Sequence, residues 1–468
     1  MLLTPNKLVS PGKVSLINLG CAKNEVDSEE MLGILQSEGY AIETSHDSNA
    51  VSHDADVVVI NTCGFIDAAK EESINTILEA LQRKERGEIK RVVVAGCLVQ
   101  RYAKELAAEM PEVDAFIGTG QMGSISQVVG QSLFRTEQLL QVGEKPHHRW
   151  VNTPTRARIG QPWTAYLKIS EGCDHACTFC AIPSFRGRHT SKPIEKIVEE
   201  AGMLAAQGVR ELNLIAQDST QYGYDLYGKM RLPEHLKELS QVDAIHWIRL
   251  FYCYPSRVNR GVIEAVAETP KVCHYIDMPL QHADNEMLRR MRRPMTRDAY
   301  LKLLAQFRAA APDVSIRTTF IVGFPGETRE HFANLESFVD EARFDRVGVF
   351  EYSVEDGTPS AQMEPKVPSR TKRTRKDALM LRQQAISLEC NQKWVGRELE
   401  VLVESVSPLD VTMAVGRSFR DAPEVDGKVY VRRCTARPGT FVRTRVVEAR
   451  PYDLVAEPIS LASSISKS

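Results

Sequence analysis

The sequence of 468 residues contains no run of about 20 apolar residues, the length that a membrane-spanning helix requires. Its first residues also lack the basic segment and the following apolar segment that mark an exported protein. Lysine and arginine number 59 against 61 aspartate and glutamate, so no overall positive charge attracts a polyanion. These absences predict a cytoplasmic protein with no membrane partner, in which any contact with nucleic acid is local.

The sequence also lacks internal repeats, and its 43% hydrophobic and 26% charged residues exclude a largely disordered chain. A prior of roughly 100 to 200 residues per domain predicts about three domains. Ten cysteines are present. In a reducing compartment they are better candidates for metal ligation or catalysis than for disulfide bonds.

The first predicted domain, residues 13–131, alternates short apolar runs with helical patterns. The apolar runs at 14–20, 56–61 and 91–96 are each followed by a helix-like segment. Strands without period-two alternation predict a parallel sheet that is covered by helices on both faces. The periodicity is lost between residues 131 and 161, which we expect to form an extended connection.

A second series of six β/α units occupies the predicted central domain, residues 155–390, with helical patterns at 194–206 and 297–310. A closed eight-unit barrel needs about 250 residues, so six units predict a partial, open parallel barrel, (β/α)6. Short β-branched runs at 393–459 predict a small all-β barrel. The predicted fold class is therefore α/β with an all-β C-terminal domain.

Three closely spaced cysteines follow the first strand of the central series. Cys173, Cys177 and Cys180 form the pattern Cys-x3-Cys-x2-Cys in a loop where barrels of this kind place active sites. Three thiolates at this spacing can hold a 4Fe-4S cluster and leave its fourth iron without a protein ligand. That iron can bind S-adenosylmethionine, so that an electron from the cluster cleaves a carbon–sulfur bond and yields a carbon radical.

A structural zinc site is the alternative interpretation of this loop. Zinc prefers Cys-x2-Cys pairs and four ligands in total. No fourth cysteine or closing histidine follows at a suitable spacing, although His175 and His189 lie nearby. The spacing therefore favours the cluster.

The other seven cysteines fall into two groups. Three of them each follow an apolar run of the first domain: Cys21, Cys63 and Cys97. The carboxyl ends of neighbouring parallel strands face one crevice, so these thiols predict a second three-thiolate site, with unrelated core cysteines as the alternative. The remaining four share no pattern and are interpreted as small buried hydrophobic residues: Cys253, Cys273, Cys390 and Cys434.

Several long segments carry a family resemblance that extends from Lys13 to about Pro458. They include LGCAKNEVDSEEMLG, INTCGFIDAAKEESI, AGCLVQRY, AYLKISEGCDHACTFCAIPSFRGRHTSKP and TTFIVGFPGET. The sequence resembles the radical S-adenosylmethionine (SAM) methylthiotransferases, in particular the branch that modifies a ribosomal protein. The resemblance implies an auxiliary 4Fe-4S cluster on Cys21, Cys63 and Cys97, a central radical SAM core and a C-terminal TRAM domain.

The resemblance also implies an enzyme, a sulfur-group transferase that adds a methylthio group to the β-carbon of an aspartate in small-subunit ribosomal protein twelve. One SAM would donate the methyl group and another would be the radical source. A low-potential electron donor, such as flavodoxin or ferredoxin, and a sulfur donor would be partners. A radical must be shielded from water, and a barrel mouth capped by a second cluster-bearing domain provides that enclosure.

Five other residues are candidates for contact with SAM. Phe179 could pack on the adenine or simply anchor the cysteine loop. Gln217 and Asp218 end the second barrel strand and could form hydrogen bonds with the cofactor, although Asp218 could instead cap a helix. Gly323 and Gly326 lie in what is, by resemblance, a cofactor-contact loop, and a tight turn explains them equally well.

Four polar residues close to the cysteines have two interpretations each. Arg186 and Arg188 could pair with the cofactor carboxylate or an acidic substrate, or they could be solvated surface charges. Asn24 and Asp27 open the helix after Cys21, and helix capping explains them as well as a catalytic role does.

Two competing functions stay open. A sister tRNA methylthiotransferase acting on isopentenyladenosine is favoured by the TRAM domain, because TRAM domains generally bind RNA. Residues 393–457 hold about as many acidic as basic residues, however, a weak footprint for phosphate, and several arginines there could instead meet acidic groups of a protein: Arg417, Arg420, Arg432, Arg433 and Arg437. A non-enzymatic iron-sulfur electron carrier would explain two clusters but not the open-iron spacing or the barrel.

Overall fold

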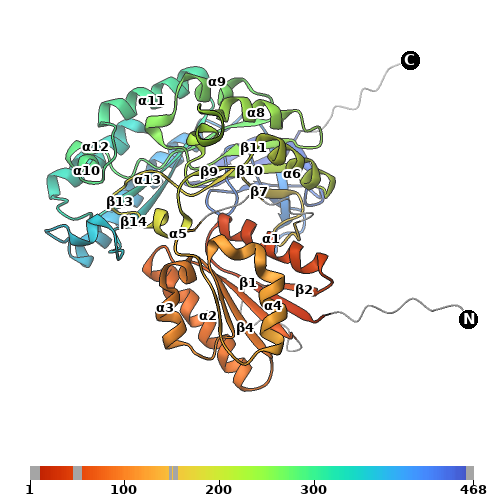
Figure 1. Ribbon diagram of the computed structural model, residues 1–468. Coiled ribbons are helices and arrows are strands. Elements are labelled where there is room, and N and C mark those ends of the chain that lie inside the picture. Colours follow the sequence, from red (N-terminus) through yellow and green to blue (C-terminus); the bar gives the residue numbers. More distant parts are fainter. Residues whose placement is uncertain (1–10, 46–54, 147–149, 151–155, 460–468) are drawn as a thin grey trace, which may run out of the picture.

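The computed structural model describes residues 11–45, 55–146, 150 and 156–459, which form three parts around three main sheets (Figure 1). In Figure 1 the N-terminal part, coloured red to orange, lies below the central part, and α1 and α5 lie where the two meet. Within the described residues, no helix has both the length and the apolar character that crossing a membrane would require.

The N-terminal sheet has six parallel strands in the order β2-β1-β3-β4-β5-β6. Separate apolar cores lie on its two faces, as expected where helices cover both sides of a parallel sheet. The strands are β1 (Lys13–Asn18), β2 (Ala41–Ser45), β3 (Val57–Thr62), β4 (Arg91–Gly96), β5 (Ala115–Ile117) and β6 (Leu139–Gln141). The helices are α1 (Ala22–Ser37), α2 (Asp67–Glu85), α3 (Cys97–Glu109) and α4 (Ile125–Phe134).

The segment 131–161 differs from the extended connection that the sequence pattern predicts. It contains the end of α4 and the strand β6, which joins the edge of the N-terminal sheet beside β5. Both β5 and β6 have three residues. Strands this short leave too little periodicity to be recognised from the sequence.

The central sheet is an open sheet of six parallel strands in the order β14-β13-β12-β11-β10-β7. The strands are β7 (Thr164–Lys168), β10 (Glu211–Ile215), β11 (Trp247–Leu250), β12 (Val272–Asp277), β13 (Ser315–Val322) and β14 (Arg346–Glu351). The longer helices are α6 (Ile194–Ala206), α8 (Leu232–Ser240), α9 (Arg260–Glu268), α11 (Arg297–Ala310), α12 (Arg329–Ala342) and α13 (Ser369–Gln392). The predicted partial (β/α)6 barrel is confirmed.

The central part also contains short elements around the strand ends. They are β8 (Ser170–Glu171), α5 (Ile182–Arg186), β9 (Thr190–Ser191), α7 (Tyr224–Tyr227) and α10 (Asn285–Arg290). The described residues also form the 3-10 turns η2 (Thr119–Ser124), η3 (Ser219–Gln221), η4 (Pro255–Arg257) and η5 (Pro359–Gln362).

The C-terminal part is a closed five-stranded barrel in the order β15-β16-β17-β19-β18 around its own apolar core. Its strands are β15 (Glu398–Val406), β16 (Ala414–Arg417), β17 (Val429–Val431), β18 (Phe441–Ala449) and β19 (Leu454–Pro458). The small all-β barrel expected from the sequence is therefore confirmed, and with it the predicted fold class.

The loop that follows β16 packs against the inner face of the central sheet. Arg417 lies 2.6 Å from Glu211 of β10, and Arg249 of β11 binds the same carboxylate at 3.0 Å. Although burial opposes ionisation, Arg417 and Arg249 hold the pKa of Glu211 down at about 2. Arg420 pairs with Asp345 at 3.0 Å. Arg417, at the end of β16, and Arg420, in the loop after it, are both buried in the contact between two domains, so the expectation that they meet a substrate is wrong.

Candidate functional site

The three dispersed cysteines lie at the carboxyl ends of three adjacent strands. Cys21 directly precedes α1, Cys63 follows β3, and Cys97 begins α3 directly after β4. Because β1, β3 and β4 are neighbours in the sheet, their ends meet at one edge. Burial, with smaller contributions from the thiols of Cys21 and Cys63, raises the pKa of Cys97 to about 12. The fold therefore brings the three thiols together.

Two glycines make this approach possible. Gly20 has φ +96°, and a Cβ there would lie 2.8 Å from the Cβ of Cys63. Gly96 has φ +107°, and its Cβ would lie 2.5 Å from the carbonyl oxygen of Thr62. Only glycine adopts such left-handed conformations without strain and leaves room for a close neighbour.

The second triplet lies in one loop that the short antiparallel pair β8 and β9 closes at its base. The backbone N–H of Cys173 donates to the carbonyl of Gly187 at 3.0 Å, and that of Cys180 donates to Cys177 at 3.2 Å. Burial raises the pKa of Cys173 and of Cys180 to about 12, and the Cys177 thiol contributes to both shifts. These thiols also share one small site.

The two triplets fit clusters better than single metal ions. Within the described residues, no three histidine, cysteine or acidic side chains lie close enough to hold one metal ion. A cubane differs because each of its thiolates binds a separate iron, so the three ligands need not converge on one point. The donor set, three thiols and no fourth ligand in each triplet, leaves one iron of such a cluster open.

Arg186 connects the two triplets. It ends α5, in the loop of the second triplet, and its side chain is buried. Its Nε donates to the Cys97 sulfur at 3.1 Å, and its Nη2 donates to Asn24 at 2.6 Å. Its Nη1 donates to Asp27 at 2.7 Å. Arg186 is therefore fully bonded inside the contact between domains and is neither a solvated charge nor free to pair with a cofactor carboxylate.

Asp27 belongs to the same buried network. Burial opposes its ionisation, but Arg186 and Lys168 together hold its pKa below the usual value. Lys168 also lies 3.0 Å from Glu171. Asn24 donates to the carbonyls of Leu19 and Thr62, and the start of α1 has no side-chain cap. Helix capping is therefore the wrong explanation for Asn24 and Asp27, whose partners lie in other strands and in the central part.

Three of the expected SAM contacts lie near the second triplet. Asp218 accepts from the backbone of Thr220 at 2.8 Å and caps η3, so its capping role is confirmed. Gln217 donates to Glu171 at 2.5 Å, while its own Oε1 is buried and has no hydrogen-bond partner in the part of the chain that the structure describes. Phe179 packs against an apolar cluster that contains Met291. Contact of these three residues with SAM stays a prediction.

The two loop glycines after β13 have left-handed backbone conformations. Gly323 has φ +74°, and a Cβ there would meet Lys372 at 2.3 Å; Gly326 has φ +83°, and its Cβ would meet Arg290 at 2.7 Å. The tight turn therefore requires glycine at both positions without any ligand. Their contact with SAM also stays a prediction.

His175 is a residue of the cysteine loop whose contacts the sequence does not reveal. Its ring stacks on Tyr254 at 3.5 Å, and its Nε2 lies 2.7 Å from Asp218. Tyr254 follows a different strand, and a spacing pattern carries no signal for that contact. The stack and the hydrogen bond with Asp218 hold the side chain of His175, which lies between Cys173 and Cys177.

The four remaining cysteines are buried: Cys253, Cys273, Cys390 and Cys434. Cys253, Cys273 and Cys390 each belong to an apolar cluster of the central part, and Cys434 lies in the core of the C-terminal barrel. Their interpretation as small core residues agrees with this placement.

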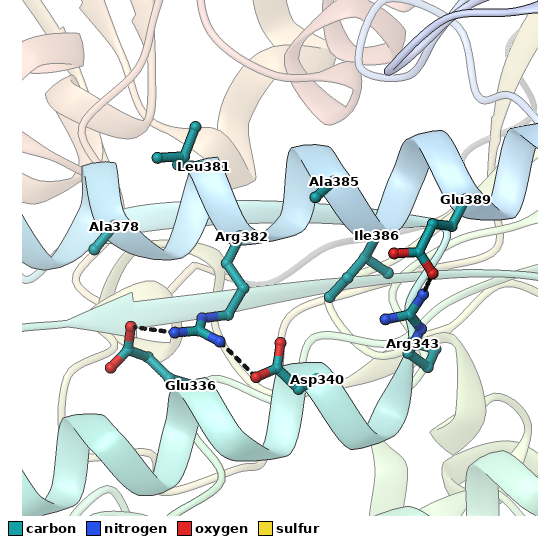
Figure 2. Close-up of a pocket in the computed structure, with 9 residues that line it drawn as sticks. All are labelled: Glu336, Asp340, Arg343, Ala378, Leu381, Arg382, Ala385, Ile386 and Glu389. Carbon is teal, nitrogen blue, oxygen red and sulfur yellow. Dashed lines mark hydrogen bonds and ion pairs between the residues drawn. The ribbon is translucent and has the colours of Figure 1, made fainter.

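Two surface grooves differ in their relation to the triplets. Figure 2 shows a groove of about 500 Å³ between α12 and α13, which is crossed by ion pairs from Arg382 to Glu336 and Asp340. It contains no cysteine and is a seam between packed helices. A second groove, of about 400 Å³, borders the cysteine loop and is lined in part by His175 and Tyr254.

An open parallel barrel with three thiols in the loop after its first strand defines a radical SAM enzyme. Residues 167–339 match the radical SAM superfamily, residues 13–118 match an uncharacterised protein family called UPF0004, and residues 395–459 match the TRAM domain. The fold also resembles the radical SAM methyltransferase TsrM of Kitasatospora setae, with a TM-score of 0.54 at 14% identity over 74% of this chain and 76% of that one.

Curated relatives identify the family more closely. The chain is 47% identical over 95% of its length, and 99% of the relative's, to the ribosomal protein uS12 methylthiotransferase RimO of Desulforamulus reducens. It is 45% identical to the RimO of Geobacter sulfurreducens over 96% of this chain and 99% of that one. The chain therefore belongs to the RimO family of radical SAM methylthiotransferases. Its predicted cofactors, SAM and two 4Fe-4S clusters, are confirmed at the level of the family.

Proposed function

We propose that this enzyme is a sulfur-group transferase that adds a methylthio group to the β-carbon of an aspartate in ribosomal protein uS12, small-subunit protein twelve. The observation that supports it most is the pair of facing cysteine triplets, joined by the Arg186 side chain, which donates to the Cys97 sulfur. The relatives, which are named uS12 methylthiotransferases, support the same activity.

The two triplets have separate roles in this proposal. Cys173, Cys177 and Cys180 hold the cluster whose open iron takes SAM, and Cys21, Cys63 and Cys97 hold the auxiliary cluster. When bound, these groups supply the carbon radical, the methyl group and the sulfur. The chain's own residues would hold the two groups near each other, because Arg186, in the loop of the second triplet, donates to the Cys97 sulfur of the first.

The five predicted cofactor contacts belong to the proposal. The buried Oε1 of Gln217 has no partner within the described residues, which is the state expected of an acceptor that awaits a ligand. Asp218 and Phe179 lie in the same region, and the turn containing Gly323 and Gly326 brings backbone to the same end of the sheet. We propose that all five line the SAM site.

We propose a low-potential electron donor, such as flavodoxin or ferredoxin, and a separate sulfur donor as further partners. The groove beside the cysteine loop supports the first of these, because two arginines, Arg257 and Arg292, line it against one carboxylate, Asp174. Positive charge beside a cluster favours an acidic donor. We propose a cytoplasmic location, where ribosomal proteins are made, and domains at 13–131, 155–390 and 393–459.

A tRNA substrate is less well supported by the charges of the C-terminal barrel. Arg443 and Arg445 both pair with Glu398, at 2.8 and 3.3 Å, and Arg432 pairs with Glu448 at 2.8 Å. Each glutamate is shared by two arginines, because Arg450 also pairs with Glu448 at 2.9 Å, so these pairs reduce the positive charge offered to a phosphate backbone without cancelling it. The relatives, which are named uS12 methylthiotransferases, are the stronger support for a protein substrate.

The direct test compares two substrates under identical conditions. Reconstituted enzyme, SAM and reductant are incubated with purified uS12 or with tRNA containing isopentenyladenosine, and the products are analysed by mass spectrometry. We expect one aspartate of uS12 to gain the mass of a methylthio group in place of hydrogen, and the tRNA to stay unmodified. Modification of tRNA without modification of uS12 would contradict the proposal and leave the radical SAM assignment intact.

A further inference from the structure

Lys23 lies at the contact between the N-terminal part and the central barrel. It is in the first turn of α1, two residues after Cys21, and only 9% of its surface is exposed. Its Nζ lies 3.2 Å from the centre of the Tyr252 ring. Within the described part of the chain, no carboxylate forms an ion pair with this ammonium group.

The neighbouring buried cations are all paired with carboxylates. Lys168 pairs with Asp27, Arg186 pairs with Asp27 and Glu171, and Arg156 pairs with Glu29 at 2.5 Å. A buried charge is unfavourable unless it is paired. A ring face compensates an ammonium only in part. Among the described residues of this contact, Lys23 is therefore a buried cation without a carboxylate partner.

Tyr252 holds the ammonium in a fixed place. It directly follows β11 and has φ +57°, a left-handed conformation that is uncommon for a tyrosine and that concentrates at functional sites. Its backbone N–H donates to Asp277 at 3.1 Å, and its carbonyl accepts from Ser219 at 3.0 Å. Asp277 of β12 and Ser219 of η3 therefore hold the turn, and the ring packs against the apolar cluster that contains Phe251.

The position of Lys23 relates it to both cluster sites. Ala22 and Val26 on the same helix pack into an apolar cluster with Ile215 and Phe251, which lie at the carboxyl ends of β10 and β11. The start of α1 therefore covers the mouth of the barrel. Lys23 is two residues from Cys21, and its ammonium group lies over Tyr252, at the end of the barrel where the loop of Cys173, Cys177 and Cys180 also follows its strand.

We propose that Lys23 binds the side-chain carboxylate of the substrate aspartate. This inference rests on the proposed function, in which the reacting β-carbon is bonded directly to that carboxylate. An ammonium that is buried, fixed and unpaired distinguishes a carboxylate from a neutral amide, because only the anion restores charge balance. Lys23 would then select aspartate and hold its β-carbon between the two triplets.

The test uses reconstituted holoenzyme and measures binding as well as turnover. Wild type, Lys23→Met and Lys23→Arg are compared for affinity, KM and kcat with purified uS12 and with uS12 in which the modified aspartate, located by mass spectrometry, is asparagine. Lys302→Met, which removes an exposed lysine of α11, is the control for loss of one charge. Iron content and cleavage of SAM without substrate are measured for each variant.

We expect wild type to bind the asparagine protein at least tenfold more weakly than the aspartate protein. Lys23→Met should lose that discrimination and raise KM for uS12 at least tenfold, while its iron content and its SAM cleavage without substrate stay those of wild type. Lys23→Arg should recover part of the affinity, and Lys302→Met should behave as wild type.

Two results would overturn the inference. If Lys23→Met keeps the wild-type preference for aspartate over asparagine, Lys23 does not bind the carboxylate. If the variant instead keeps its affinity for uS12 but loses iron or changes the electron paramagnetic resonance spectrum of the auxiliary cluster, Lys23 stabilises that cluster and does not bind the substrate. Failure of the wild-type enzyme to bind or modify uS12 is distinguishable from both, because it contradicts the proposed function itself.

Discussion

The two cysteine triplets are built in different ways. One lies in a single loop of the central part, where close spacing along the chain and the β8–β9 pair are enough to gather the thiols. The other depends on three loops that follow β1, β3 and β4, so its geometry exists only when the N-terminal sheet is folded. The local triplet can be recognised from sequence spacing, whereas the dispersed one is a property of the fold. Arg186 lies in the loop of the local triplet and donates to the sulfur of Cys97 in the dispersed triplet, so the geometry of each triplet depends on the other.

The largest effect should come from removing one triplet completely. Replacing Cys173, Cys177 and Cys180 with alanine should reduce the iron of reconstituted protein from about eight to about four atoms, because each cubane holds four irons. Cleavage of SAM and methylthiolation should both be lost. Iron analysis and product assays check this, and the matching triple change at Cys21, Cys63 and Cys97 should keep SAM cleavage. Retention of all the iron in the first variant would contradict the two-site arrangement.

The connection between the triplets should be the next most sensitive point. Arg186→Met leaves the carboxylates of Asp27 and Glu171 with one cation in place of two, and breaking a buried pair destabilises a protein by about 3 to 5 kcal/mol. The thermal unfolding midpoint of the iron-free protein should fall by several degrees. Arg188→Met is the matched control, since 92% of that side chain is exposed. Its free energy of unfolding should change by no more than about 0.5 kcal/mol. Equal midpoints for the two variants would show that the network is not stabilising.

The dispersed triplet should also be sensitive to a backbone change directly beside one of its cysteines. Gly96→Ala places a Cβ 2.5 Å from the carbonyl oxygen of Thr62, which is backbone and cannot move aside. Gly87→Ala is the control: its φ of +75° is equally left-handed, but nothing lies within 4 Å. The control should lose only about 1 to 2 kcal/mol from the left-handed conformation. We expect Gly96→Ala to lose more stability than this and about half of the iron, and similar iron in both variants would show that the loop accommodates a side chain.

Much of this architecture could be predicted from the sequence because its long elements have clear periodicity. The helices Ile194–Ala206 and Arg297–Ala310 have the predicted limits. The strands β5 and β6 could not be predicted, because three residues carry no period.

The candidate site likewise has features that sequence patterns predict and features that they do not. Spacing alone identified the local triplet, and the repeated position after apolar runs identified the dispersed one, whose ligand role stays a prediction. The partners of Arg186 and the stack of His175 on Tyr254 join residues from different domains or strands. Such contacts depend on how the sheets are placed, so no local pattern could reveal them. The buried positions of Arg417 and Arg420 were missed for the same reason.

The smallest effect should come from the cysteines outside both triplets. Cys253, Cys273, Cys390 and Cys434, changed to serine one at a time, should each leave about eight irons in the reconstituted protein. Burial raises the pKa of Cys273 to about 11 and that of Cys253 above its usual value, so in the folded protein both are neutral thiols packed against apolar neighbours. Introducing a hydroxyl there should destabilise the protein by about 1 kcal/mol, through lost packing and an unpaired polar group. Iron analysis together with thermal unfolding separates loss of a ligand from loss of packing, because replacing a merely structural cysteine changes the unfolding midpoint and leaves the iron content unchanged. Loss of about four irons from any one of these variants, at an unchanged unfolding midpoint, would show that a ligand lies outside the two triplets and would remove the basis for comparing them as complete sites.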